Sequence, residues 1–223
     1  MFRRTPLPRS ALSKAREAPS STKARILAAA EEVFAAKGFE GASTREIAAA
    51  ADVNISSLHY HWESKETLYF AVFEDIYDRI VGLVRSSIPD TSLERPANRQ
   101  VVDEAVGRLF DFFAEQPNIP KLLVRRLLET TEATSAIERD ILLPAWRRFA
   151  SWTYDLSKVD QIDAPIFMLT VHSVLLLFML DSQQFQSLLG GSVRNPELRE
   201  RLRPHVINLV HMLIRAERAR KPA

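Results

Sequence analysis

The stretch STREIAAAADVNISSLHYHWESKETLY, residues 43–69, carries the start signals of three successive helices. Ser43, followed by Glu46 three positions later, is typical of a capping box and predicts that a short helix begins here. Asn54 is suited to cap a second short helix, and Ser64 is suited to cap a third. Two short helices joined by a tight turn predict a helix-turn-helix, whose second helix enters the major groove of DNA.

The second of these helices, residues 55–63, has two different faces on a helical wheel. Its core face holds the apolar side chains of Ile55, Leu58 and Trp62. Its outward face is polar and aromatic, with Ser56, Ser57 and Tyr60, His61 on their flank and His59 nearer the core edge. Hydroxyl and imidazole groups bond phosphates and base edges, and an aromatic ring contacts thymine methyls. An ordinary surface helix leaves this short, polar and aromatic face unexplained.

Metal binding and hydrolysis fit the same side chains poorly. His59 and His61 are two residues apart, so they diverge on a helix, and no HExxH pattern or carboxylate partner stands nearby. The adjacent serines follow no strand and lack the G-x-S-x-G pattern of a hydrolase nucleophile. We therefore expect no metal, no cofactor and no catalytic residue.

Almost every segment of the 223-residue chain favours helix, since the chain has only 6 glycines and no alternating run long enough for a sheet. The first helix starts at a Ser/Thr cap in STKARILAAAEEVFAAKG and stops at Gly38. After the fourth helix, which starts at Ser64 and ends near residue 87, further helices are predicted at 99–115, 119–133, 137–158, 164–187 and 197–218, with a kink or a start at Pro144. The predicted fold is all-α, with a three-helix helix-turn-helix domain at 21–66 and a larger helical domain at 67–218, between a basic flexible arm at 1–20 and a tail at 219–223.

Charge is unevenly distributed along the chain, whose formal net charge is only +2. Residues 1–30 carry seven basic side chains against Glu17 alone, a net charge of +6, which is typical of an arm that meets nucleic acid; the alternative is a solvated tail. Its three prolines and its lack of an apolar run argue against a transit or signal peptide. Residues 24–66 carry a net charge of −3, so long-range attraction to DNA must come from the arm.

The chain has no cysteine, which excludes disulfides, thiolate zinc sites and a cysteine nucleophile. Its longest apolar stretch, IFMLTVHSVLLLFML at 166–180, has 15 residues, fewer than the roughly 20 that span a bilayer. Thr170, His172 and Ser173 interrupt it. We therefore expect a helix buried in protein, no membrane partner and a cytoplasmic location.

The run ILAAAEEVFAAKGFEGASTREIAAAADVNISSLHYHWESKETLYFAV resembles the DNA-binding domain of the TetR (tetracycline-repressor) family of bacterial transcription regulators, over about residues 24–73. The residues that carry the resemblance are Phe34, Gly38-Phe39, Ser43-Thr44, Ile47-Ala48, Leu58, Tyr60-His61, Ser64-Lys65-Glu66 and Leu68. Asp52 stands where the family's turn usually holds glycine, and Asn54 where its cap is usually serine. His59-Tyr60 replaces the usual tyrosine pair, and Trp62 the usual phenylalanine. Because aspartate tolerates a left-handed conformation, we expect the turn to be kept at some cost.

The resemblance implies roles for individual side chains. Thr44 and Arg45 match positions that contact phosphate and base, and Lys65 matches a phosphate contact at a helix N-terminus. The reading helix supplies the remaining candidates, Ser56, Ser57, His59, Tyr60 and His61. The alternative for Arg45 is an ion pair with Glu46, and the alternative for Lys65 is a solvated lysine.

The long helical remainder resembles the family's ligand-binding and dimerisation domain in architecture only. A mostly apolar ligand pocket is predicted among aromatic and imidazole side chains that would fit an ordinary core as well: Phe110, Phe113, Trp146, Phe149 and His172. A homodimer seam is predicted along the last two long helices, at Leu176, Met179, Leu209 and Leu213.

The sequence therefore predicts a ligand-responsive repressor and not an enzyme. A single short helix reads too few base pairs, so two copies should bind a palindromic operator in double-stranded DNA. A small-molecule effector is expected to release them. The alternative is a helical enzyme or small-molecule-binding module whose helix-turn-helix is incidental; the basic arm and the outward face of the reading helix favour the regulator.

Overall fold

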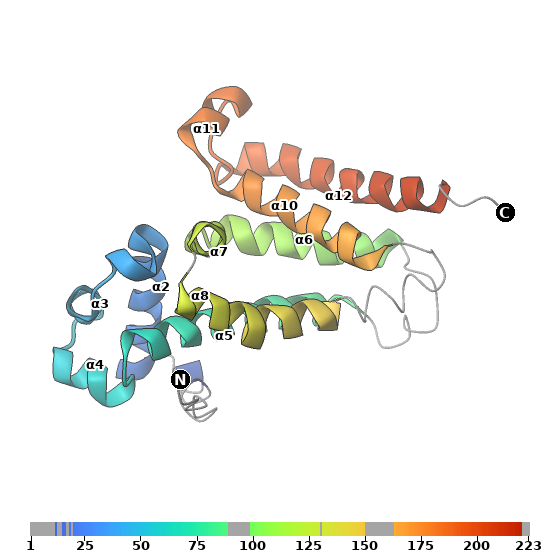
Figure 1. The fold of residues 1–223 in the computed structure, drawn as a ribbon. Helices are drawn as coiled ribbons and strands as arrows, with labels where there is room; N and C mark the ends of the chain where they lie inside the picture. Colours follow the sequence, from blue (N-terminus) through green and yellow to red (C-terminus); the bar gives the residue numbers. More distant parts are fainter. Residues whose placement is uncertain are drawn as a thin grey trace. The chain divides into compact units, whose positions relative to one another are not determined.

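The computed structural model describes residues 12, 15–16, 18, 20–88, 99–129, 131–149 and 163–219, in which every regular element is helical (Figure 1). The all-α prediction is therefore confirmed. In chain order the elements are α2 (Thr22–Gly41), α3 (Thr44–Ala50), α4 (Ile55–His61), α5 (Lys65–Ser86), α6 (Arg99–Glu115), α7 (Asn118–Leu128), α8 (Glu132–Ile137), the π-helical turn η2 (Glu138–Leu142), α10 (Ala164–Met179), α11 (Gln183–Leu189) and α12 (Pro196–Ala219). Residues 143–149 continue as helix after η2.

Two compact units make up the chain. The first comprises the described residues of Met1–Asp78 and Lys121–Leu142, and the second those of Arg79–Pro120 and Leu143–Ala223. The sequence suggested a boundary near residue 66, whereas here the segment 121–142 shares a unit with the helix-turn-helix. Three helical stretches continue from one unit into the other: α5 after Asp78, α7 after Pro120, and residues 132–149 after Leu142.

The core of the first unit is built on aromatic rings from α2 and α5. Phe34 and Phe39 of α2 contact Tyr69 of α5 with ring centroids 4.8 and 4.9 Å apart, and Tyr69 contacts Phe73 at 5.0 Å. All four side chains are buried, and burying one such side chain stabilises a fold by about 1.5–3 kcal/mol. Helices α3 and α4 pack on α2, so this core is the base of the helix-turn-helix.

Helix α2 is interrupted at Gly38, where φ is 75° and ψ is −179°. The predicted stop at this glycine is confirmed, because only glycine adopts this left-handed, extended conformation without strain. One further short turn carries the chain to Gly41 before α3 begins.

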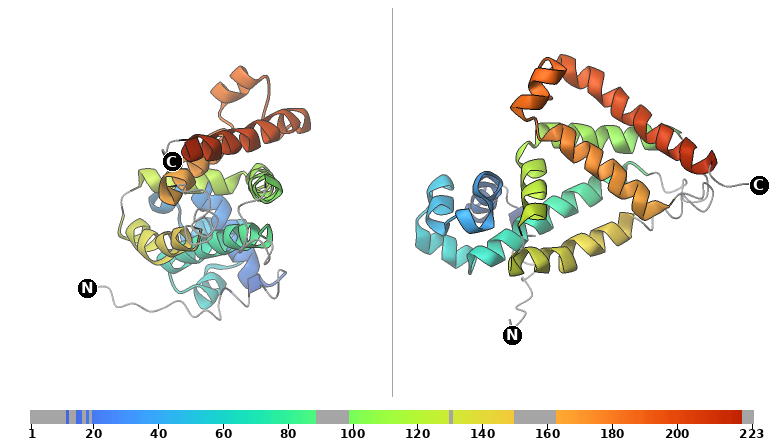
Figure 2. Two further views of the ribbon diagram at one scale, coloured as in Figure 1. Left: turned by 90° about the vertical axis from the view of Figure 1, so that its right-hand side faces the viewer. Right: turned by 45° about the horizontal axis from the view of Figure 1, so that its top comes forward.

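Helices α6, α10 and α12 lie against one another in the second unit (Figure 2). Their buried side chains include Val106, Phe110, Leu175, Leu176, Val206 and Val210. A polar seam also joins α6 and α12, because Arg203 Nε donates to Asp111 Oδ2 at 3.0 Å. The guanidinium of Arg203 lies over Gly107, where a Cβ would stand 2.2 Å from Arg203 Nη2. This glycine therefore makes room for the ion pair.

The prediction of one continuous helix over 164–187 is wrong, because α10 ends at Met179 and α11 starts at Gln183. Asp181 breaks the helix with a φ of 49°, and its carboxylate accepts Ser192 Oγ at 2.6 Å and the Val193 N–H at 3.0 Å. These bonds stabilise a left-handed residue that the apolar pattern does not show. Within the described ranges no single helix is long and apolar enough to cross a bilayer; α10 and α11 reach that length and composition only as a pair, with a 90° bend between them.

Helix boundaries between α7 and Pro144 also differ from the prediction. Helix α8 starts early, because Thr131 Oγ1 accepts the Thr134 N–H at 3.1 Å and caps it. The chain then passes through η2 directly before Pro144. A proline lacks an N–H, and its ring clashes with the carbonyl four residues back in an α-helix. A π turn shifts the backbone hydrogen bonds by one residue and so changes the position of that carbonyl. This accounts for the irregularity expected at Pro144. Residues 150–158 of the predicted helix lie outside the described residues.

Candidate nucleic-acid interface

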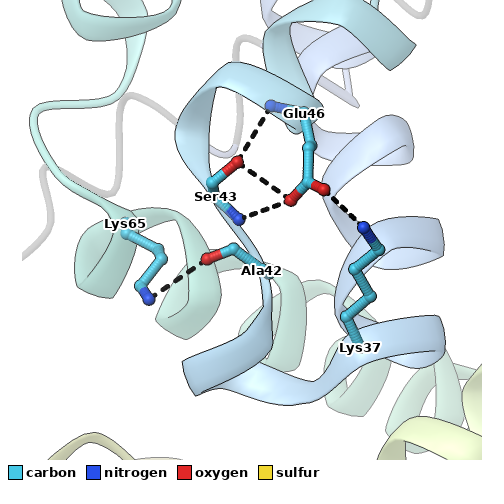
Figure 3. A network of polar contacts seen from close by, with 5 residues as sticks. All are labelled: Lys37, Ala42, Ser43, Glu46 and Lys65. Carbon is cyan, nitrogen blue, oxygen red and sulfur yellow. Dashed lines mark hydrogen bonds and ion pairs between the residues drawn. The ribbon is translucent and has the colours of Figure 1, made fainter.

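Helix α3 begins in a polar network around Ser43 and Glu46 (Figure 3). Ser43 Oγ accepts the Glu46 N–H at 3.2 Å, and the Glu46 carboxylate accepts the Ser43 N–H at 3.0 Å, so the predicted capping box is confirmed. Lys37 of α2 pairs with the other oxygen of this carboxylate. Hydrogen bonds from Lys37 and then Ser43 lower the pKa of Glu46 to about 2. The network ties the first turn of α3 to α2.

The turn between α3 and α4 depends on Asp52, whose φ of 52° is left-handed. The expectation that aspartate keeps the turn in place of glycine is confirmed. The Val53 N–H donates to Ala48 O at 3.0 Å, and Asn54 Oδ1 accepts the Ser57 N–H at 2.7 Å and caps α4. The helix-turn-helix therefore forms despite departures in its turn and in its cap.

Helix α4 buries one face and leaves the other open. Leu58 and the C-cap residue Trp62 are buried in the first unit, whereas Tyr60 is 85% exposed. The prediction that Ile55 joins the core face is wrong: its side chain is 36% exposed, because within its own span α4 buries only Leu58. The other reading-helix candidates are placed on the open side or at its edge, with Ser56 and His59 exposed and Ser57 and His61 half-buried.

His61 lies edge-on to Tyr60, with ring centroids 5.1 Å apart. Partial burial, and then the positive charge of Lys23, lower the pKa of His61. The neutral imidazole is therefore favoured at pH 7, and it offers one donor and one acceptor nitrogen, which suits base edges better than phosphate. In the described part of the chain, no group of three His, Asp or Glu side chains could hold a metal ion.

Arg45 is an exposed cation in the first turn of α3, next to the half-buried Thr44. The alternative of an ion pair with Glu46 is not what the structure shows, because Lys37 holds that carboxylate. No other ion pair of Arg45 occurs among the described residues. Its guanidinium is therefore available for a ligand outside the chain.

Lys65 has a different placement from the one its resemblance implies. Its Nζ donates to Ala42 O at 3.2 Å (Figure 3). It also donates to Phe39 O at 2.9 Å and lies 4.4 Å from the centre of the Phe39 ring. Lys65 therefore braces the turn that precedes α3. The ammonium has three N–H donors, so one remains for a phosphate oxygen while the two carbonyls stay bound.

Part of the basic arm is anchored to the first unit. Leu12 and Ala15 are buried, and Arg16 Nε and Nη1 bond Asp75 at 2.8 Å and Asp78 at 3.0 Å on α5. The charge of Arg16 is thus offset by two carboxylates. The remainder of the arm, residues 1–11, 13–14, 17 and 19, lies outside the described residues.

The pocket candidates all belong to the second unit. Trp146 and His172 lie together, with ring centroids 5.2 Å apart in an edge-on arrangement. Phe110 and Phe113 are buried on α6, and Phe149 is half-buried. The structure therefore brings one pair of the five together, between residues 143–149 and α10.

The dimer candidates divide into two groups. Leu176 and Met179 are buried inside the second unit, whereas Leu209 and Leu213 of α12 are half-buried. The exposed apolar side chains of this region are Ile166, Leu169 and Leu177 on α10 and Met212 on α12. On α10 they recur at helical spacing and form a stripe that the sequence alone did not separate from the buried face.

A side chain of α7 and one directly after it contact the end of α2, and sequence reasoning missed both. Arg125 Nη2 donates to Ala36 O at 3.0 Å, and Glu129 Oε2 accepts the Phe39 N–H at 3.4 Å. The partners are 89 and 90 residues apart in the chain. The signal in the sequence was Gly38. A glycine ends a helix, but it also lets the side chains of another segment approach the backbone closely.

A family model described as bacterial regulatory proteins, tetR family, matches residues 26–72. Among curated proteins, the HTH-type transcriptional activator FasR of Mycolicibacterium smegmatis is 39% identical over 88 residues, which cover 40% of this chain and only 38% of FasR. The HTH-type transcriptional repressor Rv3405c of Mycobacterium tuberculosis is 30% identical over 161 residues, which cover 67% of this chain and 84% of that protein.

Solved structures agree with this fold over most of the chain. A bacterial regulatory protein of the tetR family from Rhodococcus RHA1 superposes with a TM-score of 0.65 at 21% identity, covering 87% of this chain and 97% of that one. The fatty acid degradation regulator FadR from Bacillus halodurans gives a TM-score of 0.63 at 15% identity, covering 85% of this chain and 92% of that one.

Proposed function

The chain belongs to the TetR family of bacterial regulatory proteins, and from this premise we propose that it is a transcriptional repressor that leaves a palindromic operator when a small, mostly apolar molecule binds. The observation that carries the proposal is the open face of α4, where Tyr60 is 85% exposed while Leu58 on the opposite face is buried. An aromatic, hydroxyl and imidazole surface on the second helix of a helix-turn-helix fits the edges of base pairs. Because its DNA partner lies in the bacterial cytoplasm, we place the protein there too.

Selection from random double-stranded DNA tests this function directly. We expect repeated binding and amplification with the full chain to enrich a palindrome whose half-site centres are about 34–36 Å apart, one helical turn of DNA. Enrichment of no sequence would contradict the proposal and favour a helical module with an incidental helix-turn-helix. The enriched duplex then serves as the operator in every experiment below.

Pairing of two copies through the second unit follows from the palindrome. We place the seam on the exposed stripe of Ile166, Leu169 and Leu177 on α10 and on the exposed Met212 of α12. Contiguous exposed apolar side chains mark association surfaces, and a two-fold interface uses the same patch on both copies.

The effector site is proposed around Trp146 and His172, two candidates whose ring centroids lie 5.2 Å apart. An effector there acts on DNA by shifting the two reading helices relative to each other. Helix α5 is one continuous path, since it starts at the helix-turn-helix and ends in the second unit. Coupling of this kind amounts to about 1–3 kcal/mol, and operator DNA must weaken effector binding by the same factor.

Removing residues 1–11 is expected to flatten the salt dependence of binding to random DNA. The deletion takes away Arg3, Arg4 and Arg9 and no acidic residue, and it spares the buried Leu12. Each lost phosphate contact lowers the slope of log affinity against log salt by about 0.9. Fluorescence anisotropy across a sodium chloride series measures the slope.

Arg16→Gln is the matched control for this deletion, because the Arg16 guanidinium is already held by Asp75 and Asp78. We expect this variant to keep the wild-type slope. A deletion that also keeps it would show that the arm is only a solvated tail.

A further inference from the structure

Phe39 is held from three sides at the point where α2 ends. Its carbonyl accepts Lys65 Nζ of α5 at 2.9 Å, and its N–H donates to the Glu129 carboxylate beyond α7 at 3.4 Å. Its ring lies under the Lys65 ammonium and 4.9 Å from the buried Tyr69 ring. One residue thus joins α2, α5 and the end of α7.

The contact from α7 requires the glycine that precedes Phe39. A Cβ at Gly38 would stand 2.0 Å from Glu129 Oε1 and 3.0 Å from Arg125 Cδ, so any other residue would exclude both side chains from their present places. Arg125 Nη2 donates to Ala36 O at 3.0 Å. Arg125 and Glu129, hereafter the α7 clamp, therefore grip a carbonyl and an N–H on either side of Gly38.

The two bonds of the clamp differ in their exposure to water: the Arg125–Ala36 bond is exposed, whereas the Glu129–Phe39 bond is partly buried beside two buried side chains. Tyr69 and Arg126 are buried next to it. Burial, and then the charge of Glu129, raise the pKa of Tyr69 above its usual range. A backbone N–H that loses its acceptor in such a place costs about 1–3 kcal/mol. The position of α7 and the conformation of the α2 end are therefore energetically linked.

Only three residues separate Phe39 from the Ser43 cap, after which α3 presents Thr44 and Arg45. Helix α7 itself begins in the second unit, at Asn118, and reaches the clamp without interruption of the helix up to Leu128. A displacement of α7 along its axis therefore acts on the α2–α3 turn through two polar contacts.

Resting on the proposed function, we propose that the α7 clamp is a regulatory contact that positions α3 for DNA and gives the second unit a route to the reading surface separate from α5. Arg125 and Glu129 are positioning residues in this scheme, because neither touches DNA. Binding of DNA at α3 and α4 must then be felt in α7, by the reciprocity of coupled sites.

Hydrogen exchange with and without the selected operator tests the clamp in the full chain. In the wild type we expect operator to slow amide exchange over residues 121–128 by about 5- to 150-fold, the usual range for coupled sites. In Glu129→Ala this protection should disappear while protection over α4 remains, and operator affinity should fall by about 5- to 150-fold, the factor that corresponds to an unsatisfied buried N–H.

Glu129→Gln should restore both readouts, because its amide oxygen still accepts the Phe39 N–H. Glu132→Gln is the matched charge control, since Glu132 is an exposed glutamate of the same unit, and it should behave as the wild type. If Glu129→Ala does not fold, Glu129→Asp, which keeps the charge but shortens the side chain by one methylene, is expected to show the same loss.

Wild-type operator affinity together with wild-type protection of residues 121–128 in the Ala or Asp variant would overturn the clamp. Failure of the proposed function looks different, because then the wild type selects no duplex at all. In that case the exchange rate of the Phe39 amide in the DNA-free protein still tests the contact. An unchanged rate in Glu129→Ala would show that Glu129 does not bind the Phe39 N–H.

Discussion

Tyr60→Ala is expected to weaken operator binding by about 1–3 kcal/mol, roughly 5- to 150-fold, which is the value of one good base-edge contact. The Tyr60 side chain is 85% exposed and stands on the open face of α4, so nothing in the core is lost with it. The free energy of unfolding should therefore change by no more than about 0.5 kcal/mol, as for other surface substitutions. Fluorescence anisotropy with the selected operator, and urea unfolding of the same samples, measure the two quantities.

Two further variants make this result specific. Tyr60→Phe keeps the ring next to His61 and removes only the hydroxyl, so it separates a hydrogen bond from a contact with a thymine methyl. Leu188→Ala removes another exposed large side chain, on α11 of the second unit, and should leave operator affinity unchanged. Wild-type affinity and unchanged sequence preference in Tyr60→Ala would show that α4 does not read DNA through this residue.

Short-range signals explain why the helix-turn-helix was predictable. The Ser43 cap with Glu46, the Asn54 cap and the stop at Gly38 each involve groups within a few residues of one another. Their geometry depends on local backbone conformation and not on the rest of the fold. Asp52 is the instructive case, because its left-handed φ follows from its place in the turn although its residue type departs from the family.

Long-range contacts account for what the sequence did not predict. The phosphate contact expected of Lys65 stays a prediction, but its bonds to two carbonyls 26 and 23 residues earlier in the chain were not predicted. Glu129 meets Phe39 across 90 residues, and Asp181 is held by Ser192 and Val193, which lie beyond helix α11. Each depends on which elements pack together, and residue patterns within one helix carry no information about that.

The same contacts change the electrostatic account of the reading surface. Of the four basic residues in the acidic segment 24–66, Lys37 pairs with Glu46 and Lys65 binds carbonyls, which leaves Arg25 on α2 and Arg45 in the first turn of α3, both exposed. Attraction over distances near a Debye length, about 8–10 Å at moderate salt, must then come from residues outside this segment. This strengthens the expectation that the arm governs the salt dependence and α3 and α4 the sequence preference.

Leu169→Glu is expected to lower the association constant of the dimer by about 10²- to 10⁴-fold. Burying one leucine contributes about 1.5–3 kcal/mol, and a two-fold interface loses that contribution from both copies. The introduced carboxylates also have to be desolvated, which adds to the loss. Leu169 is 58% exposed within the single chain, so the fold itself should tolerate the change. Sedimentation equilibrium at micromolar concentration measures the association, and operator affinity should fall with it, because a monomer holds one half-site.

Leu176→Ala is the informative partner of this variant, since the sequence placed Leu176 in the seam while the structure buries it in the second unit. If the seam lies on the exposed stripe of α10 as proposed, Leu176→Ala lowers the free energy of unfolding by about 2–5 kcal/mol, as core truncations do, and leaves the dimer intact at micromolar concentration. The opposite pattern would be a dimer that survives Leu169→Glu but is lost in a folded Leu176→Ala protein. It would show that the dimer interface lies at the residues predicted from the sequence. It would also show that α10 turns its buried face to the partner when two copies meet.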